Sequence, residues 1–191
     1  MTVFKKSLDE WRSLILSVET QNFDDRIRDT TQLVSEAFTK NNKLLLAGNG
    51  GSAAEAQHMA GEYCATLSSS NFRKGYPALA LTTDTSFVTA WANDFGFTNV
   101  FARQIETLGA DGDVFFAYST SGNSENILAA IEVAKSKNIK IVGFTGENGG
   151  LLKEKVDICF SVPSKSTARI QEMHTLLGHT ICASVEIDLG H

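Results

Sequence analysis

Four hydroxyl side chains that stand close together mark the segment of this chain best suited to hold an anion. The stretch STSGNS at 119–124 follows a short apolar run and precedes a segment of helical character. Free N–H groups and the positive dipole end of a helix N-terminus attract negative charge, and nearby hydroxyls add uncharged donors. A plain capping loop would need only one Ser or Thr. The segment therefore favours a phosphate site made by its hydroxyls, which are Ser119, Thr120, Ser121 and Ser124.

A glycine-rich turn is a second candidate anion site. The stretch GNGGS at 48–52 joins an apolar run to an alanine-rich helical stretch, so it can present backbone N–H groups to a phosphate. Glycines are equally expected in a tight strand-to-helix turn, and the residues leave both interpretations open. The turn lacks the lysine of a P-loop, and no acidic residue stands about 20 positions further on to hold a ribose, which disfavours nucleotide binding.

A histidine and a carboxylate lie one turn apart on the helical stretch that follows the glycine-rich turn. His58 and Glu62 are four residues apart and therefore share a helix face. Such a pair can bind one metal ion, transfer protons, or form nothing more than a surface contact. The spacing alone leaves these alternatives open.

Five short apolar runs are expected to form the strands that position these residues. They are continuous rather than alternating, as in parallel strands buried on both faces, and they lie at 43–48, 78–83, 113–119, 139–146 and 157–163. Segments of helical character separate or follow them at 52–67, 85–108, 124–137 and 167–189. Two amphipathic helices precede the first strand. This alternation predicts an α/β fold, a single domain with a parallel five-stranded sheet flanked by helices, and ligands of such sheets bind beyond the carboxyl ends of the strands.

Composition argues against several classes of protein. With 17 basic and 22 acidic side chains, the net charge of −5 gives no electrostatic footprint for nucleic-acid binding. No apolar run approaches the roughly 20 residues of a membrane-spanning helix, and the start of the chain has no signal-peptide character, so we expect a cytoplasmic protein without membrane partners. Three cysteines without CxxC spacing argue against a disulfide framework or a cysteine zinc site.

Several motifs in one order carry a closer resemblance. The chain is similar to the sugar isomerase (SIS) fold family, and within it to the phosphoheptose isomerases, in the stretches GNGGSAAEAQHMAGE, AWANDFGF, YSTSGNSENI, FTGENGG and ARIQEMHTLLGH. The resemblance implies a flavodoxin-like sandwich with a SIS sugar-phosphate-binding domain at 40–191. It also implies an N-terminal helical hairpin at 1–39 that packs subunits together, in a homotetramer.

The resemblance also implies roles for individual residues. In the family the serine-rich loop, here Ser119, Thr120, Ser121 and Ser124, holds the substrate phosphate. The rest of the sugar contacts positions that fall on Asn49, Gly50, Gly51, Glu62, Asn93, Asp94 and Gln171. The ligands of one zinc ion per subunit fall on His58, Glu62, Gln171 and His179. Glu62 would be the catalytic base and His179 the general acid.

The implied metal ligands pose a geometric difficulty. Gln171 and His179 are eight residues apart, about 12 Å along a continuous helix. They can meet one ion if they reach it from opposite sides, if the helix begins late, or if a neighbouring subunit contributes. His174 lies nearer Gln171 and is a rival ligand; otherwise we expect a helix-surface or interface histidine. Where some family members carry an acidic residue shortly before the glutamine, this chain has Ala168 and Arg169, so no acid–base role is expected there.

The implied activity is the isomerisation of sedoheptulose 7-phosphate to D-glycero-D-manno-heptose 7-phosphate, the first step of ADP-/GDP-heptose biosynthesis. A base moves a proton between C1 and C2 and an acid moves one between the oxygens, through an enediol, while a divalent ion polarises the carbonyl. The alternative is a non-catalytic SIS protein that binds the replication initiator, whose group ARIQEMH also resembles, or that senses a sugar phosphate. Glu62 and His179, which the initiator-binding group lacks, favour the enzyme. A dinucleotide-binding oxidoreductase is a more distant alternative.

Overall fold

Five parallel strands run through the centre of the computed structural model, which describes residues 1–191. The strands, in chain order, are β1 (Leu44–Ala47), β2 (Ala78–Ala80), β3 (Val114–Tyr118), β4 (Lys140–Thr145) and β5 (Ile158–Ser161). Their order in the sheet is β2-β1-β3-β4-β5, which confirms the predicted parallel five-stranded sheet. From β1 the chain builds first to one side, to β2, and then to the other, to β3. The sheet therefore has a topological switch point between β1 and β3, where ligands of open α/β sheets bind.

The register of β1 and β3 brings the two candidate loops together. Leu44 pairs with Val114 and Ala47 with Ala117, so both strands end at the same level of the sheet. The glycine-rich turn leaves the end of β1, and the serine-rich loop leaves the end of β3. Both strands are fully buried, as their continuous apolar runs predict.

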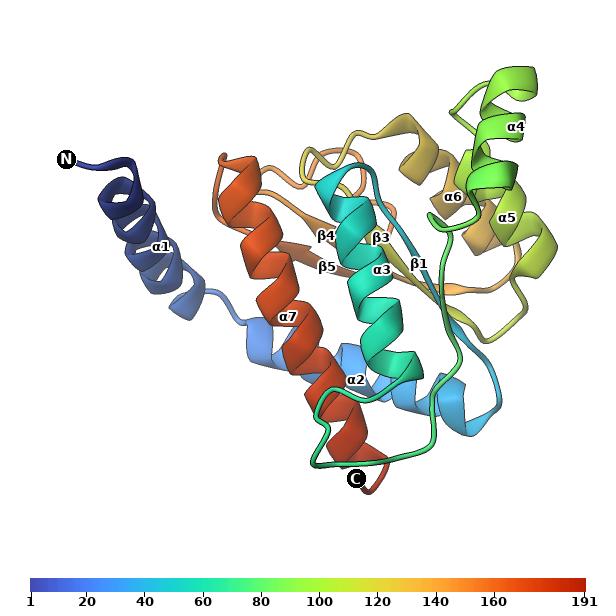
Figure 1. Cartoon of the computed structure of the whole chain (residues 1–191), viewed down its shortest axis with the longest axis horizontal. Coiled ribbons are helices and arrows are strands. Elements are labelled where there is room, and N and C mark those ends of the chain that lie inside the picture. The colour runs from blue at the N-terminus through green and yellow to red at the C-terminus, as the bar shows by residue number, and fades with distance from the viewer.

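Alternate residues of each central strand face two separate hydrophobic cores. Leu44 and Leu46 pack with residues of α2 (Phe23–Thr39), α3 (Gly51–Cys64) and α7 (Thr167–Asp188) on one face. Leu45 and Ala47 pack with residues of α5 (Val100–Leu108) and α6 (Glu125–Ser136) on the other. Figure 1 shows α3 and α7 side by side over the same face of the sheet. The helices cover both faces, as expected for a doubly covered parallel sheet.

The single helical stretch expected at 85–108 is two helices, and that prediction is wrong in this respect. α4 (Thr85–Phe95) ends at Gly96, whose φ of +83° is a conformation that a residue with a side chain rarely adopts, and α5 begins at Val100. No residue of α4 is buried. The break therefore leaves α4 on the outside of the molecule, at its edge in Figure 1.

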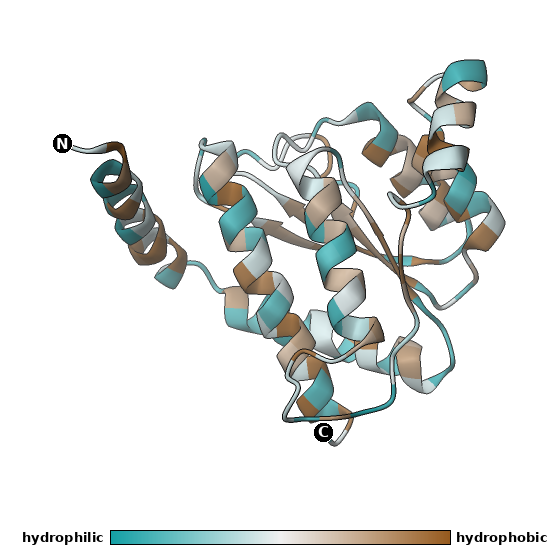
Figure 2. Cartoon of the chain, in the orientation of Figure 1, coloured by the Kyte–Doolittle hydropathy of each residue, from teal (hydrophilic) through white to brown (hydrophobic).

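The two helices before the first strand are present, and they differ in how they pack. α2 lies along the body of the molecule against α7 and β5. α1 (Val3–Glu19) extends away from the body in Figure 1 and contacts it near the first turns of α7, where Arg169 donates to the carbonyl of Ser7. Apolar side chains of α1 remain exposed, among them Phe4 and Leu16, and they give this helix its brown bands in Figure 2. No helix of the chain is long and apolar enough to cross a membrane.

Candidate active site

The hydroxyls of the serine-rich loop converge on one another. Ser119 Oγ lies 2.9 Å from Ser124 Oγ and 3.5 Å from Ser121 Oγ. Ser124 occupies the N-cap position of α6, yet its side chain makes no capping hydrogen bond. Its hydroxyl is therefore directed to its neighbours and not used by the helix. This is the arrangement of a donor cluster at a helix N-terminus, which suits an anion.

Gly122 lets the serine-rich loop fit against the loop after β4. Its φ is +68°, and a Cβ at this position would collide with the backbone of Gly149. The backbone N–H of Leu152 donates to the carbonyl of Gly122, at 3.0 Å. A side chain at residue 122 would push these two loops apart, so the glycine has a packing role in addition to its place in the motif.

The glycine-rich turn is bound to the first turn of α6, the helix that follows the serine-rich loop, through a reciprocal pair of amides. Asn49 Nδ2 donates to Asn126 Oδ1 at 2.9 Å, and Asn126 Nδ2 donates to Asn49 Oδ1 at 2.8 Å. Asn126 belongs to the first turn of α6, two residues after Ser124. Gly50, with φ +56°, caps α3 without a side chain, so the first N–H groups of that helix have no side-chain partner. Two helix N-termini therefore lie next to each other at the switch point of the sheet.

Three side chains that can transfer protons or bind metal gather between α3 and α7. His58 Nε2 and His179 Nε2 are 2.8 Å apart, and His58 Nδ1 is 3.6 Å from Glu62 Oε1. One potential ligand atom from each residue lies within 4.8 Å of the others. Imidazole nitrogens and a carboxylate oxygen are the donors that zinc and similar divalent ions take in open catalytic sites. These residues, His58, Glu62 and His179, are called the His–Glu cluster below.

Gln171 lies apart from the His–Glu cluster. α7 is continuous from Thr167, so the helix does not begin late, and Gln171 stands two turns before His179. Its side-chain amide occupies the space beside Gly51, where a Cβ would come within 2.6 Å of it. Two ways remain for Gln171 to bind the same ion as His179: the two side chains reach it from opposite sides, or a neighbouring subunit contributes one of them. The geometry of one chain favours neither. It does place the amide at the glycine-rich turn, where a sugar hydroxyl can reach it.

Asn93 and Asp94 lie at the end of α4, and their side chains bond to each other. Asn93 Nδ2 donates to Asp94 Oδ1 at 2.7 Å, and both residues are exposed. No hydrogen bond or ion pair joins either residue to the two loops or to the His–Glu cluster. The structure of one chain therefore does not bring this pair into the candidate site.

Sequence reasoning missed Glu55, a buried carboxylate beside the cluster. Its Oε2 accepts a hydrogen bond of 2.6 Å from Thr175 Oγ1 of α7, and its Oε1 has no partner. Burial raises the pKa of Glu55, against the opposing effects of Thr175, His58 and His179. The signal was present in the sequence, because Glu55 stands three residues before His58 and seven before Glu62 and so shares their helix face.

His174 is neither a surface nor an interface histidine, and that expectation is wrong. It is 1% exposed, and its ring packs against Tyr118 and Phe144 of the sheet. Its Nε2 lies 3.3 Å from the carbonyl oxygen of Thr145. Desolvation lowers the pKa of His174 to about 4. The side chain points into the core beneath the serine-rich loop, so its proximity to Gln171 in the sequence does not make it a rival ligand.

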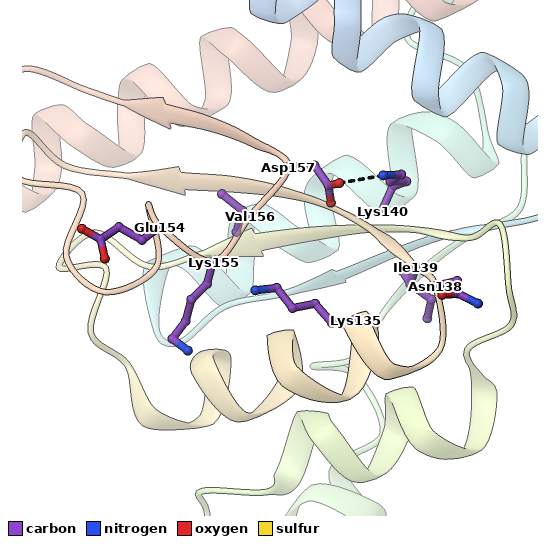
Figure 3. A pocket seen from close by; sticks show the side chains of 8 residues that line it. All are labelled: Lys135, Asn138, Ile139, Lys140, Glu154, Lys155, Val156 and Asp157. Atoms are coloured by element: carbon purple, nitrogen blue, oxygen red, sulfur yellow. Dashed lines mark hydrogen bonds and ion pairs between the residues drawn. The ribbon is translucent and has the colours of Figure 1, made fainter.

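Two hollows lie at opposite ends of the strands, one at the carboxyl ends and one at the amino ends, and only the first adjoins the candidate site. A cavity of about 370 Å³ is lined by Thr120 and Ser121 of the serine-rich loop together with residues that follow β4 and β5. The other, of about 390 Å³, lies where β4 and β5 begin and is shown in Figure 3. Its lysines are partly neutralised, since Lys140 bonds to Asp157 and Lys155 pairs with Glu132. The lysine-lined hollow is therefore a poor match for a phosphate.

Comparisons of the sequence and of the fold with known proteins point to the same family. The family model described as the SIS domain matches residues 8–146. The chain is 49% identical over 172 residues to phosphoheptose isomerase 2 of Campylobacter jejuni, covering 90% of this chain and 85% of the relative. It is 50% identical over 167 residues to the phosphoheptose isomerase of Burkholderia pseudomallei, covering 85% and 84%. The solved structure of phosphoheptose isomerase GmhA from Neisseria gonorrhoeae is similar with a TM-score of 0.88 and 34% identity, over 97% of this chain and 100% of that one.

Proposed function

This chain belongs to the SIS domain family and within it to the phosphoheptose isomerases, and we propose that its two loops and its His–Glu cluster together form the catalytic site. It is an aldose–ketose isomerase that converts sedoheptulose 7-phosphate to D-glycero-D-manno-heptose 7-phosphate, the first step of ADP-/GDP-heptose biosynthesis. The observation that carries the assignment of the site is the convergence of His58, Glu62 and His179 from two helices that are far apart in the sequence. A protein that only binds a sugar phosphate has no need of this set.

The serine-rich loop is the proposed phosphate site. Its clustered hydroxyls and the N-terminus of α6 can donate to a phosphate without a cation, and the loop contributes to the hollow at the carboxyl edge of the sheet. The remaining hydroxyls of the sugar would contact the glycine-rich turn at Asn49, Gly50 and Gly51, the side chains of Glu62 and Gln171, and the exposed pair Asn93 and Asp94. Asn93 and Asp94 lie outside the two loops and the His–Glu cluster, so they would have to reach the sugar by movement of α4 or from another subunit.

Glu62 and His179 are the proposed proton-transfer groups. Interconversion of a ketose and an aldose moves one proton between C1 and C2 and another between the two oxygens, with an enediol between these steps. Glu62 would take and return the proton at carbon, and His179 would donate the proton at oxygen. Their placement on facing helices lets the two groups address neighbouring atoms of one substrate.

The donor set of the cluster fits a divalent ion, and we propose one zinc ion per subunit. His58, Glu62 and His179 would hold it. Gln171 would be the fourth protein ligand, and because its amide lies at Gly51 in one chain, it would have to reach the ion from the opposite side or come from a neighbouring subunit. Bound there, a divalent ion supplies polarisation of the substrate carbonyl. The close approach of the two Nε2 atoms supports this assignment, because the two imidazoles are already directed at one point.

The exposed apolar side chains of α1 support a proposed homotetramer. Residues 1–39 would form the part of the chain that packs subunits together, and residues 40–191 the sugar-phosphate-binding domain. Within one chain α2 contributes Phe23, Val34, Ala37 and Phe38 to the core, whereas Leu14 is the one fully buried residue of α1, so α1 is the helix left to contact other subunits. An isolated surface helix seldom keeps such side chains as Phe4 and Leu16 in water. Sedimentation at micromolar concentration tests this, and a monomer would contradict it.

A direct assay tests the function. The purified protein would be incubated with ketose phosphates of five, six and seven carbons, after removal of metal and after addition of zinc. We expect turnover of the seven-carbon ketose phosphate and its loss on chelation. Absence of turnover with the seven-carbon substrate in the presence of metal would contradict the assignment. A non-catalytic SIS protein would bind the sugar phosphate in the same experiment without converting it.

A further inference from the structure

A buried arginine outside the candidate site joins the two helices that carry the His–Glu cluster. Arg73 lies in the segment between α3 and β2 and is only 4% exposed. Its Nε donates to Glu186 Oε1 at 2.6 Å. Glu186 lies in the last turn of α7, and the same oxygen also accepts from the backbone N–H of Leu67. This ion pair therefore fixes the segment after α3 to the end of α7.

The same guanidinium binds the last carbonyls of α3. Arg73 Nη2 donates to the carbonyl of Glu62 at 2.9 Å, and Nη1 donates to the carbonyls of Tyr63 at 2.9 Å and Ala65 at 3.3 Å. The last carbonyls of a helix have no partner within the helix, and they attract positive charge. α3 has no basic residue in its own last turn. Arg73 supplies the missing donors and cation from outside the helix.

An aromatic ring holds the guanidinium in place. The carbon of the Arg73 guanidinium lies 4.3 Å from the centre of the Tyr76 ring, and Tyr76 in turn stacks on Phe38 of α2 at 4.9 Å. A planar, multiply bonded guanidinium in this setting cannot be replaced by the ammonium of lysine without losing most of its contacts. The guanidinium is therefore held by the hydrogen bonds of its nitrogens and by the Tyr76 ring against one face.

Glu62 and His179 have no short covalent connection, so their separation depends on how α3 and α7 are joined. α3 and α7 run side by side, so that residues of α3 contact residues about 120 positions later in α7: Glu55 is bonded to Thr175, and His58 lies next to His179. The cluster thus lies between the Glu55–Thr175 hydrogen bond and the contacts of Arg73. Glu62 is three residues from Ala65, the C-cap of α3, where a helix without capping partners frays.

We propose that Arg73 and Glu186 are positioning residues for the isomerisation, because they fix the end of α3 that carries Glu62 to the helix that carries His179. Metal ligands and proton-transfer groups must be held to within about 0.5 Å by their supporting contacts. The inference rests on the proposed roles of Glu62 and His179. It adds that the pair controls metal affinity and turnover without touching the substrate, while phosphate binding, which depends on the loop after β3, is independent of it.

The test compares Arg73→Lys and Glu186→Gln with a matched buried ion pair. Asp113, which is completely buried, pairs with the partly exposed Lys43 at 2.7 Å at the amino ends of β1 and β3. Its other side-chain hydrogen bonds go to Asn42 and Ala110 and none reaches α3 or α7, so Asp113→Asn is a control for a general loss of stability. Zinc affinity is measured on metal-free protein by competition with a chelator, and turnover and KM are measured separately. We expect both variants to lower zinc affinity and turnover by about 10–100-fold, the usual effect of losing a contact that orients metal ligands, with KM nearly unchanged.

The outcomes separate positioning from stability. If Arg73→Lys and Glu186→Gln lower the melting temperature as Asp113→Asn does but retain zinc affinity and turnover, the inference is wrong and the pair is only structural. If all three variants lose zinc affinity equally, the effect is also one of general stability, and the inference fails. Should the wild-type chain not isomerise the sugar, the proposed function fails, while the comparison of zinc affinities still decides the inference. If Glu186→Gln prevents folding, Glu186→Asp provides the second variant for the same measurements.

Discussion

The serine-rich loop and the His–Glu cluster are held in place by different means. The loop is held by backbone hydrogen bonds to neighbouring strands and loops, since Ser119 N donates to the carbonyl of Phe144 and Gly146 N to that of Thr120. The cluster is held by side chains from two helices that are more than a hundred residues apart in the sequence. With the roles proposed above, substrate binding would depend on local backbone structure, whereas proton transfer would depend on long-range packing. The two functions should respond separately to mutation.

The largest expected effect separates the proton-transfer groups from the binding loop. Glu62→Gln and His179→Gln keep most of the side-chain size but remove the proposed base and acid, so each should lower turnover by about 10²–10⁴, with a much smaller effect on KM. Steady-state kinetics at saturating and limiting substrate measures both quantities. Metal content must be determined for each variant, because loss of the ion would imitate loss of a catalyst. Near-normal turnover with the metal retained would remove that residue from the mechanism.

The pH dependence of the free energy of unfolding tests the core between the two regions. His174 belongs to α7, which carries His179, and its ring packs against Tyr118, directly before the serine-rich loop. Its pKa is lowered from 6.5 to about 4 by burial, so the unfolded chain binds the proton more readily. The resulting stability is complete above pH 6.5 and is lost as the pH falls towards about 4, by about 3 kcal/mol in total. Urea unfolding at neutral pH and at acidic pH measures it. His174→Gln should flatten this dependence; curves with equal slopes for variant and wild type would refute the assignment.

Substitutions in the serine-rich loop should act on binding and not on the chemical step. A hydrogen bond to a charged group contributes about 1.5–3 kcal/mol, so Ser119→Ala should raise KM by about 10–100-fold with little change in turnover at saturation. Ser136→Ala, at the far end of the same helix α6, provides a control, since that hydroxyl bonds only to the carbonyl of Val133. A fall in turnover without a rise in KM would show that the two regions are not separate.

The smallest expected effect concerns Glu55, the carboxylate beside the cluster. Because burial raises its pKa, its contribution to stability is present at pH values below the ordinary glutamate range and is lost as the pH rises through the raised value. Glu55→Gln should therefore stabilise the metal-free protein at neutral pH and make no difference in acid. Thermal unfolding at neutral pH should therefore show a higher melting temperature for the variant than for the wild-type chain, and equal melting temperatures in acid. A lower melting temperature at neutral pH would mean that the charged form is favoured.

Much of the fold could be predicted because its signals are local. Continuous apolar runs such as LLLA and VFFAY indicate strands buried on both faces, and the hydroxyls after β3 are adjacent in the sequence. The break at Gly96 was missed because one glycine in a helical pattern is compatible with either a helix or its end. The burial of His174 was missed because its helix has apolar residues on more than one side, so periodicity did not mark the face that turns inward.

The cluster was harder to predict than the loop for a physical reason. His58 and Glu62 form a local pair, but His179 comes to them only through the packing of α3 on α7. Arg73 and Glu186 are 113 residues apart, and the segment that carries Arg73 has no periodic pattern to indicate burial. Contacts of this kind depend on tertiary structure, and the spacing of residues along one helix cannot reveal them.

The reciprocal amide pair at the switch point also affects how the protein ages chemically. Asn49 precedes Gly50, and asparagine before glycine is the sequence in which the next backbone nitrogen attacks the side-chain amide most readily. Ammonia leaves, and water then opens the resulting cyclic imide to an aspartate or an isoaspartate. In the folded chain both ends of the Asn49 amide are bonded to Asn126, which restrains the rotation that this attack requires. Storage under mildly denaturing conditions should therefore deamidate Asn49 faster than storage in buffer, as peptide mapping by mass spectrometry would measure. Once formed, the carboxylate would present acceptors where Asn126 needs a donor, so aged preparations should lose the contact between the glycine-rich turn and α6 before they lose their fold.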